Sequence, residues 1–115
     1  MVDSLDKMYT REFLQKNRWM RATAGLFGKP SSLDRFIIQA QAGLIHNCYD
    51  SLKQINVPTL VIGGEQDIAV GSDGSRELAE QIPCSRLIMY PQYGHALYEE
   101  DKNFNRTVLE FLKSE

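Results

Sequence analysis

The sequence predicts an α/β fold in which a helical segment precedes a βαβα unit with two parallel strands. Before residue 56, apolar side chains recur at helical spacing, whereas after it two short apolar runs alternate with two amphipathic stretches. A strand, a crossover helix and a second strand form a right-handed unit with parallel strands. We therefore divide the 115 residues into a helical segment at 1–54 and a βαβα part at 55–115.

The first segment is predicted to be helical over residues 4–26, and G-K-P at 28–30 ends that stretch. Its candidate inward-facing residues are Met8, Phe13, Leu14 and Met20. S-S-L-D at 31–34 predicts a capping box, in which Ser31 accepts from an amide near Asp34 and Asp34 reaches back. The next helix carries an apolar stripe formed by Leu33, Phe36, Ile37, Ala40 and Leu44.

The second segment begins with T-L-V-I-G-G, which follows Pro58 and ends in two glycines. A run that is apolar on both faces is typical of a parallel strand covered by helices on each side, so we predict strands at 59–63 and 86–90. A helix over about 73–82 links them, with Ser72 or Asp73 as its cap and Pro83 as its stop. Its inward residues are predicted to be Leu78, Ala79 and Ile82. Asp101 is predicted to cap a last helix whose stripe is Phe104, Val108, Phe111 and Leu112.

Composition excludes several classes of protein. With 43% hydrophobic and 24% charged residues the chain is globular, and a net charge of −2 with interspersed signs argues against nucleic acid and anionic membranes as partners. No apolar run reaches the ~20 residues that span a bilayer. The N-terminus has acids where a signal peptide has bases, and Cys48 and Cys84 match no redox or metal-ligand spacing. We expect a cytoplasmic protein with reduced thiols.

Two titratable residues follow the two predicted strands. Asp67 comes after the first strand in G-G-E-Q-D, and His95 comes after the second in Y-G-H. The carboxyl ends of parallel strands meet at one edge of a sheet, so we expect a carboxylate oxygen and a ring nitrogen roughly 2.6–3.2 Å apart. A carboxylate that orients an imidazole is the acid–base part of a Ser-His-Asp triad. Taken singly, Asp67 is also compatible with a turn or cap residue, and His95 with a hydrogen-bonded loop residue.

The stretches I-N-V-P-T-L-V-I-G-G-E-Q-D, S-R-E-L-A-E-Q-I-P, Y-G-H-A-L-Y-E-E and F-N-R-T-V-L-E-F-L together resemble the C-terminal part of an α/β-hydrolase. By this resemblance the strands correspond to the seventh and eighth of that fold, Asp67 is the triad acid and His95 the triad base. Residues 4–54 resemble its cap or lid. The resemblance implies an esterase-like enzyme that hydrolyses a small-molecule acyl substrate, with no cofactor and no metal.

The chain departs from that family in what precedes the cap. It contains no G-x-S-x-G elbow and no H-G oxyanion loop; His46 lies at a predicted helix end, and G-S-D-G-S at 71–75 has its glycines at other offsets. Helix capping explains Ser72 and Ser75 better than a nucleophilic role. We therefore expect a C-terminal piece of a longer hydrolase, a fragment that is inactive by itself. The alternative is a non-catalytic α/β module for oligomerisation or partner binding.

The missing strands predict an open edge on the strand at 59–63. Such an edge is a template for pairing, so we expect a homo-oligomer, a lid helix across it, or pairing with the missing N-terminal half.

Several single residues have weaker assignments. Tyr93 and Tyr98 could pack around the imidazole, and Trp19 with Phe27 could line a substrate-facing surface, but packing in the core or lid is the preferred role for all four. Glu99 and Glu100 are expected to act on the dipole of the last helix, and Cys84 is expected to be a bystander.

Overall fold

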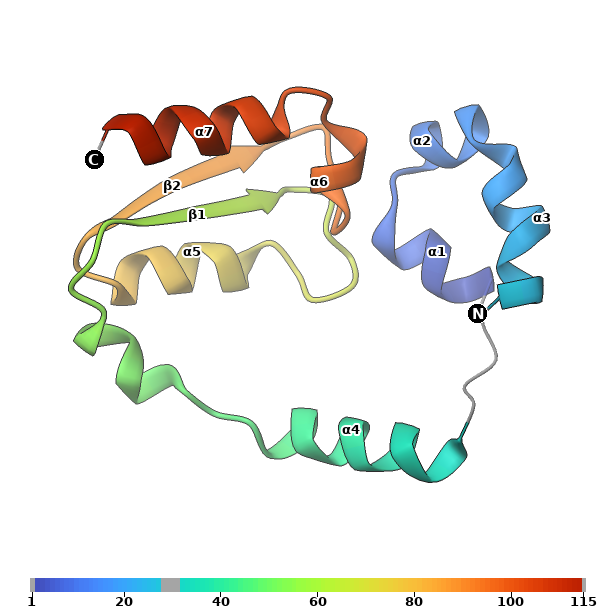
Figure 1. Cartoon of the computed structure of the whole chain (residues 1–115), viewed down its shortest axis with the longest axis horizontal. Coiled ribbons are helices and arrows are strands. Elements are labelled where there is room, and N and C mark those ends of the chain that lie inside the picture. Colours follow the sequence, from blue (N-terminus) through green and yellow to red (C-terminus); the bar gives the residue numbers. More distant parts are fainter. Residues whose placement is uncertain (1, 28–31, 115) are drawn as a thin grey trace.

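The structure is a computed structural model that describes residues 2–27 and 32–114. Helices come first and a βαβα arrangement follows, which confirms the predicted fold class (Figure 1). The elements in chain order are α1 (Val2–Met8), α2 (Arg11–Lys16), α3 (Arg18–Phe27), α4 (Leu33–Ile45), the 3₁₀ helix η1 (Tyr49–Gln54), β1 (Thr59–Gly64), α5 (Asp73–Gln81), β2 (Ser85–Tyr90), α6 (Leu97–Glu100) and α7 (Phe104–Ser114). None of the helices within these ranges is long and apolar enough to cross a membrane.

Strands β1 and β2 pair in parallel, in a register that runs from Thr59 opposite Ser85 to Gly64 opposite Tyr90. Helices α5 and α7 lie on opposite sides of the strand pair (Figure 1). The side chains of β1 alternate accordingly: the Gly63 position faces Ser75 of α5, whereas Ile62 lines a groove together with residues of α7. The predicted strands, their direction and the connecting helix are therefore confirmed.

One edge of β1 is open. The amides of Thr59 and Glu65 donate to the carbonyls of Cys84 and Tyr90, at 2.9 and 3.0 Å. Since the direction of the amides alternates along a strand, the N–H groups of Leu60 and Ile62 point away from β2. No other strand of the described chain pairs with β1 on that side.

The helical stretch predicted over 4–26 is broken into α1, α2 and α3. Thr10 starts α2 because its Oγ1 accepts a hydrogen bond from the Phe13 amide at 3.3 Å. Asn17 ends α2, and its backbone N–H donates to the Phe13 carbonyl. Short polar side chains that bond to nearby backbone favour such helix ends over a continuous helix. The breaks let α1–α3 curl around a small core in which Leu14 is buried.

Helix α4 forms as the apolar periodicity predicts, but it buries none of its residues. Ser31 of the predicted capping box lies outside the described residues; the N-cap is Ser32, whose Oγ accepts from the Arg35 amide at 3.4 Å. In Figure 1 the helix runs apart from the strands. Its stripe is exposed, with Leu33 at 68%, Phe36 at 56% and Leu44 at 86% of full exposure. The stripe therefore has no partner within the described chain.

The inward faces of α5 and α7 are only half buried. Ile82 and Phe111 are buried as predicted, but Leu78 and Leu112 are exposed, at 40% and 64%. A two-stranded sheet is narrower than the faces of two helices, so the outer residues of each stripe have nothing to cover them. The radius of gyration is 16.5 Å, against roughly 13 Å for a compact domain of this length. The chain is thus more open than a self-contained domain.

Candidate active site

The loops that follow β1 and β2 lie side by side at the carboxyl end of the sheet. The Glu65 amide donates to the Tyr90 carbonyl and the Gln66 amide donates to the Tyr93 carbonyl, each at 3.0 Å. Gly64 makes this approach possible: a Cβ atom there would lie 2.3 Å from the Tyr93 carbonyl oxygen. The second glycine of the strand is therefore required by contact between the two loops.

Asp67 is held by hydrogen bonds to both carboxylate oxygens. Its Oδ1 accepts from the amides of Ala69 at 2.9 Å and Val70 at 3.1 Å, while its Oδ2 lies 2.9 Å from His95 Nδ1. The side chain is 11% exposed. Burial by itself raises the pKa of the Asp67 carboxyl, but the hydrogen bonds with His95 and with the two amides outweigh it, so this pKa lies below its ordinary value. Asp67 is therefore a carboxylate at neutral pH.

His95 lies beside an open groove. A carboxylate only accepts hydrogen bonds, so Nδ1 carries the proton shared with Asp67, and in the neutral ring Nε2 then has the free lone pair. The His95 side chain is 37% exposed, and Nε2 has no hydrogen-bond partner within residues 2–27 and 32–114. The adjoining groove, of about 410 Å³, is lined by apolar side chains that include Ile62, Tyr98 and Phe104. This arrangement suits a base that takes a proton from a group placed in the groove.

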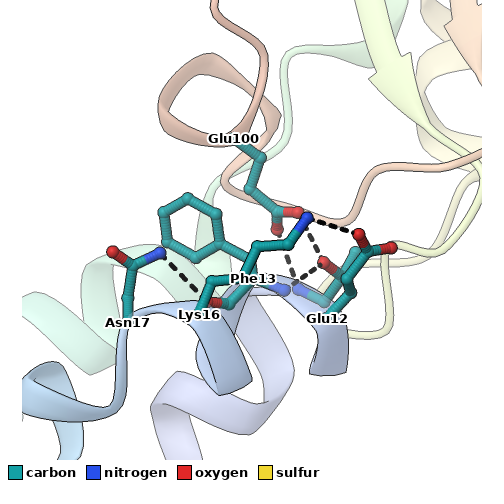
Figure 2. A network of polar contacts seen from close by, with 6 residues as sticks. Glu12, Phe13, Lys16, Asn17 and Glu100 are labelled. Atoms are coloured by element: carbon teal, nitrogen blue, oxygen red, sulfur yellow. Dashed lines mark hydrogen bonds and ion pairs between the residues drawn. The ribbon is translucent and has the colours of Figure 1, made fainter.

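The backbone around His95 rests on the junction between α1 and α2. The Ala96 amide donates to the Met8 carbonyl at 2.8 Å, and Ala96 is fully buried. Two carboxylates of α6 complete the contact. Glu100 accepts from the Thr10 amide at 2.8 Å and from Thr10 Oγ1 at 2.6 Å. Figure 2 shows Glu100 reaching from α6 to the start of α2.

The second carboxylate, Glu99, accepts a hydrogen bond from the Tyr9 hydroxyl at 2.6 Å. Burial and this bond raise the pKa of Tyr9 above its ordinary value. The prediction that Glu99 and Glu100 act on the dipole of the last helix is therefore wrong, because both belong to α6 and bind residues 90 positions away. Asp101 does precede α7, where its carboxylate accepts from the Asn103 amide at 3.0 Å.

The aromatic residues named from the sequence differ in position. Tyr98 lines the groove with His95, whereas Tyr93 packs against Tyr90 with ring centroids 5.7 Å apart. Trp19 is 65% exposed, and the Phe27 side chain lies outside the described residues. Ser72 occupies the N-cap position of α5 but makes no capping hydrogen bond. Both cysteines are free and exposed. Among the described residues, no Ser or Thr hydroxyl bonds to His95, and no cluster of three His, Cys, Asp or Glu side chains suits a metal ion.

A cleft of about 1110 Å³ opens between α1–α3 and the loop after β1, bordered by Ile68 next to Asp67. Arginines dominate its polar lining. Arg21 is paired with Asp6, whereas Arg11 and Arg18 form no ion pair with any described residue. Two unpaired guanidinium groups in one cleft suit a carboxylate or another anion.

Comparison with known proteins places these features in a wider context. A sequence model of the alpha/beta hydrolase fold matches residues 1–102. The chain is 29% identical, over 97% of its length, to a 2-hydroxy-6-oxononadienedioate/2-hydroxy-6-oxononatrienedioate hydrolase of Pseudomonas putida, of which it covers 42%. It is 34% identical, over 91% of its length, to a 2-hydroxy-6-oxo-6-phenylhexa-2,4-dienoate hydrolase of Burkholderia cepacia, of which it covers 36%.

A solved structure is similar over almost the whole chain. MGS-M2, an alpha/beta hydrolase enzyme from a Medee basin deep-sea metagenome library, superposes with a TM-score of 0.81 at 29% identity. The match covers 96% of this chain and 42% of that one. The chain therefore spans about two fifths of the length of the proteins it matches.

Proposed function

The chain belongs to the α/β-hydrolase family, and from that premise we propose that Asp67 and His95 are the acid and base of a Ser-His-Asp triad. The serine would come from the part of the fold that carries the nucleophile elbow, and the whole protein would hydrolyse an ester or related acyl bond. One observation carries the proposal: His95 Nδ1 is bonded to a carboxylate that backbone amides hold in place, while Nε2 has no hydrogen-bond partner among the described residues and the side chain is partly exposed.

The proposed reaction uses the two ring nitrogens in different ways. Nε2 accepts the proton of the serine hydroxyl as its oxygen attacks the acyl carbon, and then gives that proton to the leaving group. In the second half of the reaction, the hydrolysis of the acyl-enzyme, Nε2 takes a proton from water as the water oxygen attacks the acyl carbon. The serine oxygen then leaves and receives that proton. Asp67 stabilises the imidazolium that forms in each half and holds the Nδ1–H tautomer throughout.

For the substrate, we propose an acyl compound that carries a carboxylate. The two relatives from Pseudomonas putida and Burkholderia cepacia are named for hydrolysis of a dienedioate and a dienoate, both of which are carboxylates. Arg11 and Arg18 in the cleft beside the Asp67 loop supply guanidinium groups for such a group. The exposed thiols of Cys48 and Cys84 fit a reducing compartment, so the proposed location is the cytoplasm.

The proposed partner of this chain is the nucleophile-bearing part of the same fold, and two surfaces support that choice. The open edge of β1 offers the amides of Leu60 and Ile62, and α4 offers an apolar stripe that nothing in the described chain covers. The same surfaces also suit self-association in a non-catalytic oligomerisation module, which is the second candidate function.

An experiment on a joined protein separates the two functions. The part of MGS-M2 that precedes the matched region is fused to this chain, and hydrolysis of p-nitrophenyl acetate is followed. Saturable turnover by the fusion, with none by either part alone, supports the triad. A fusion that folds, as judged by circular dichroism, yet shows no turnover rejects the catalytic role and leaves the oligomerisation module.

A further inference from the structure

The residues on both sides of His95 contact one short segment far away in the sequence. Ala96 donates its amide hydrogen to the Met8 carbonyl at 2.8 Å. Gly94 is enclosed between two neighbours, since a Cβ atom there would lie 3.3 Å from the Met8 carbonyl oxygen and 3.5 Å from that of Gln66. The backbone of His95 is thus held between the α1–α2 junction and the loop that carries Asp67.

A carboxylate fixes that junction to α6. Glu100 binds Thr10 through two hydrogen bonds, from the backbone amide to Oε1 and from Oγ1 to Oε2, at 2.8 and 2.6 Å. Thr10 Oγ1 also accepts from the Phe13 amide and starts α2. One residue therefore connects the direction of α2 with the position of α6, the helix that directly follows the His95 loop.

We propose that Thr10 and Glu100 are positioning residues for His95, which keep its Nδ1 aligned with Asp67. The proposal rests on the proposed function in one respect: the alignment of His95 with Asp67 serves catalysis only if His95 is the catalytic base. Gly94 and Ala96 are the neighbours of His95 in the chain, and both contact the α1–α2 junction. A shift of that junction therefore moves the imidazole relative to Asp67. Charge-assisted hydrogen bonds to a half-buried carboxylate resist such a shift better than neutral ones.

A neighbouring ion pair provides a matched control. Glu12 lies two residues from Thr10, and its carboxylate pairs with Lys16 at 2.6 Å within α2 (Figure 2). Both of those side chains are more than 70% exposed, and within the described chain neither forms a hydrogen bond or ion pair with α6 or with the His95 loop. Removing the pair changes charge and local helix content, while both partners of the Thr10–Glu100 hydrogen bonds are kept.

The test measures which ring nitrogen of His95 carries the proton. The 115-residue chain is labelled with ¹⁵N, and the imidazole nitrogens are recorded by NMR at a pH where both histidines are neutral. His46 is exposed at the end of α4 and serves as the internal reference for a free ring. Asp67→Asn sets the signal expected when the partner carboxylate is lost.

We expect Glu100→Ala and Thr10→Val to move the His95 nitrogen shifts by more than half of the change that Asp67→Asn produces. Glu100→Gln and Thr10→Ser keep an acceptor and a hydroxyl, so they should retain most of the wild-type signal, and Glu12→Ala should retain all of it. Circular dichroism establishes that each variant is folded. If Glu100→Ala does not fold, Thr10→Val decides the question alone.

His95 shifts that stay at their wild-type values in folded Thr10→Val and Glu100→Ala would overturn the proposal. Equal shifts for Glu12→Ala would overturn it as well, because the effect would then not depend on the contact with α6. These outcomes are independent of turnover by the fusion protein. An inactive fusion with tautomer shifts as expected would reject the triad and leave the positioning contact in place.

Discussion

His95 and Asp67 stand 28 positions apart in the sequence, yet Nδ1 of the first lies 2.9 Å from Oδ2 of the second. Two parallel strands in register bring their following loops together, and a glycine at the end of β1 allows those loops to touch. The acid is nearly buried and the base is accessible, at 11% and 37% exposure of their side chains. This difference in exposure, between a fixed carboxylate and a partly exposed imidazole, suits a proton-transfer pair.

Replacing Gly64 should separate the pair. In Gly64→Ala the new Cβ meets the backbone of Tyr93 and Gly94, so the loops must move apart at a cost of about 1–3 kcal/mol in the free energy of unfolding. The matched control is Gly74→Ala, because nothing lies within 4 Å of that position in α5. Urea denaturation compares the two; equal stability of both variants would contradict the close contact.

The low pKa of Asp67 makes its contribution to stability depend on pH. A carboxyl whose pKa is lower in the folded chain stabilises the fold above its unfolded pKa, and this stabilisation is lost as pH falls through the folded pKa. The free energy of unfolding of wild type should therefore exceed that of Asp67→Asn at pH 7, and the difference should shrink as pH falls below about 4. A difference that is constant between pH 7 and pH 3 would show that Asp67 is not stabilised as a carboxylate.

The open edge of β1 should drive self-association when no partner is present. Light scattering at rising protein concentration should show species larger than a monomer. Leu60→Pro removes an amide that points away from β2, so it should weaken the association and keep the β1–β2 pairing. Val61→Pro removes an amide on the paired side and should unfold the strand pair instead. A wild-type chain that stays monomeric at high concentration contradicts this prediction.

The arginines of the cleft should act on binding of charged substrates. In the fusion protein, Arg18→Gln and Arg11→Gln are expected to raise KM about 10- to 100-fold for an ester that carries a carboxylate, the range that loss of a charged hydrogen bond gives. KM for a neutral ester should stay the same. Arg106→Gln, on the exposed surface of α7, is the control. Equal effects on both esters would argue against recognition of an anion.

The isolated 115-residue chain should show no enzymatic turnover of p-nitrophenyl esters. Nε2 of His95 has no hydroxyl to deprotonate among the described residues, so its exposed imidazole gives only background acceleration. We expect a rate that is linear in ester concentration and no higher than that of a surface histidine in another small protein. A saturable rate, abolished both by His95→Ala and by Asp67→Asn, would reveal a nucleophile within this chain.

The strands, the crossover helix and the Asp67–His95 pair could be predicted because each depends on local pattern. An apolar run flanked by Pro58 and two glycines predicts a strand, and parallel strands place their following loops at one edge. The faces of α5 and α7 were harder, since Leu78 and Leu112 are exposed only because the sheet has two strands. A helical stripe shows which residues are apolar, but not whether anything covers them.

The contacts of α1 and α2 with α6 could not be predicted. Thr10 and Glu100 are 90 positions apart, and neither belongs to a motif that indicates the other. A local signal for the start of α2 is T-R-E-F at 10–13, in which a threonine precedes a charged turn, and it lies inside the stretch predicted to be helical over 4–26. Long-range hydrogen bonds of this kind depend on how segments pack, which a single sequence does not reveal.

Turnover by the fusion protein tests most directly whether His95 is the base of a hydrolase triad. The chain contains two histidines, so His46→Ala is a matched control for His95→Ala. We predict that His95→Ala lowers kcat/KM by about 10³- to 10⁶-fold, as loss of a triad histidine does. His46→Ala should leave kcat/KM unchanged. A His95→Ala fusion that folds and retains wild-type kcat/KM would contradict that role.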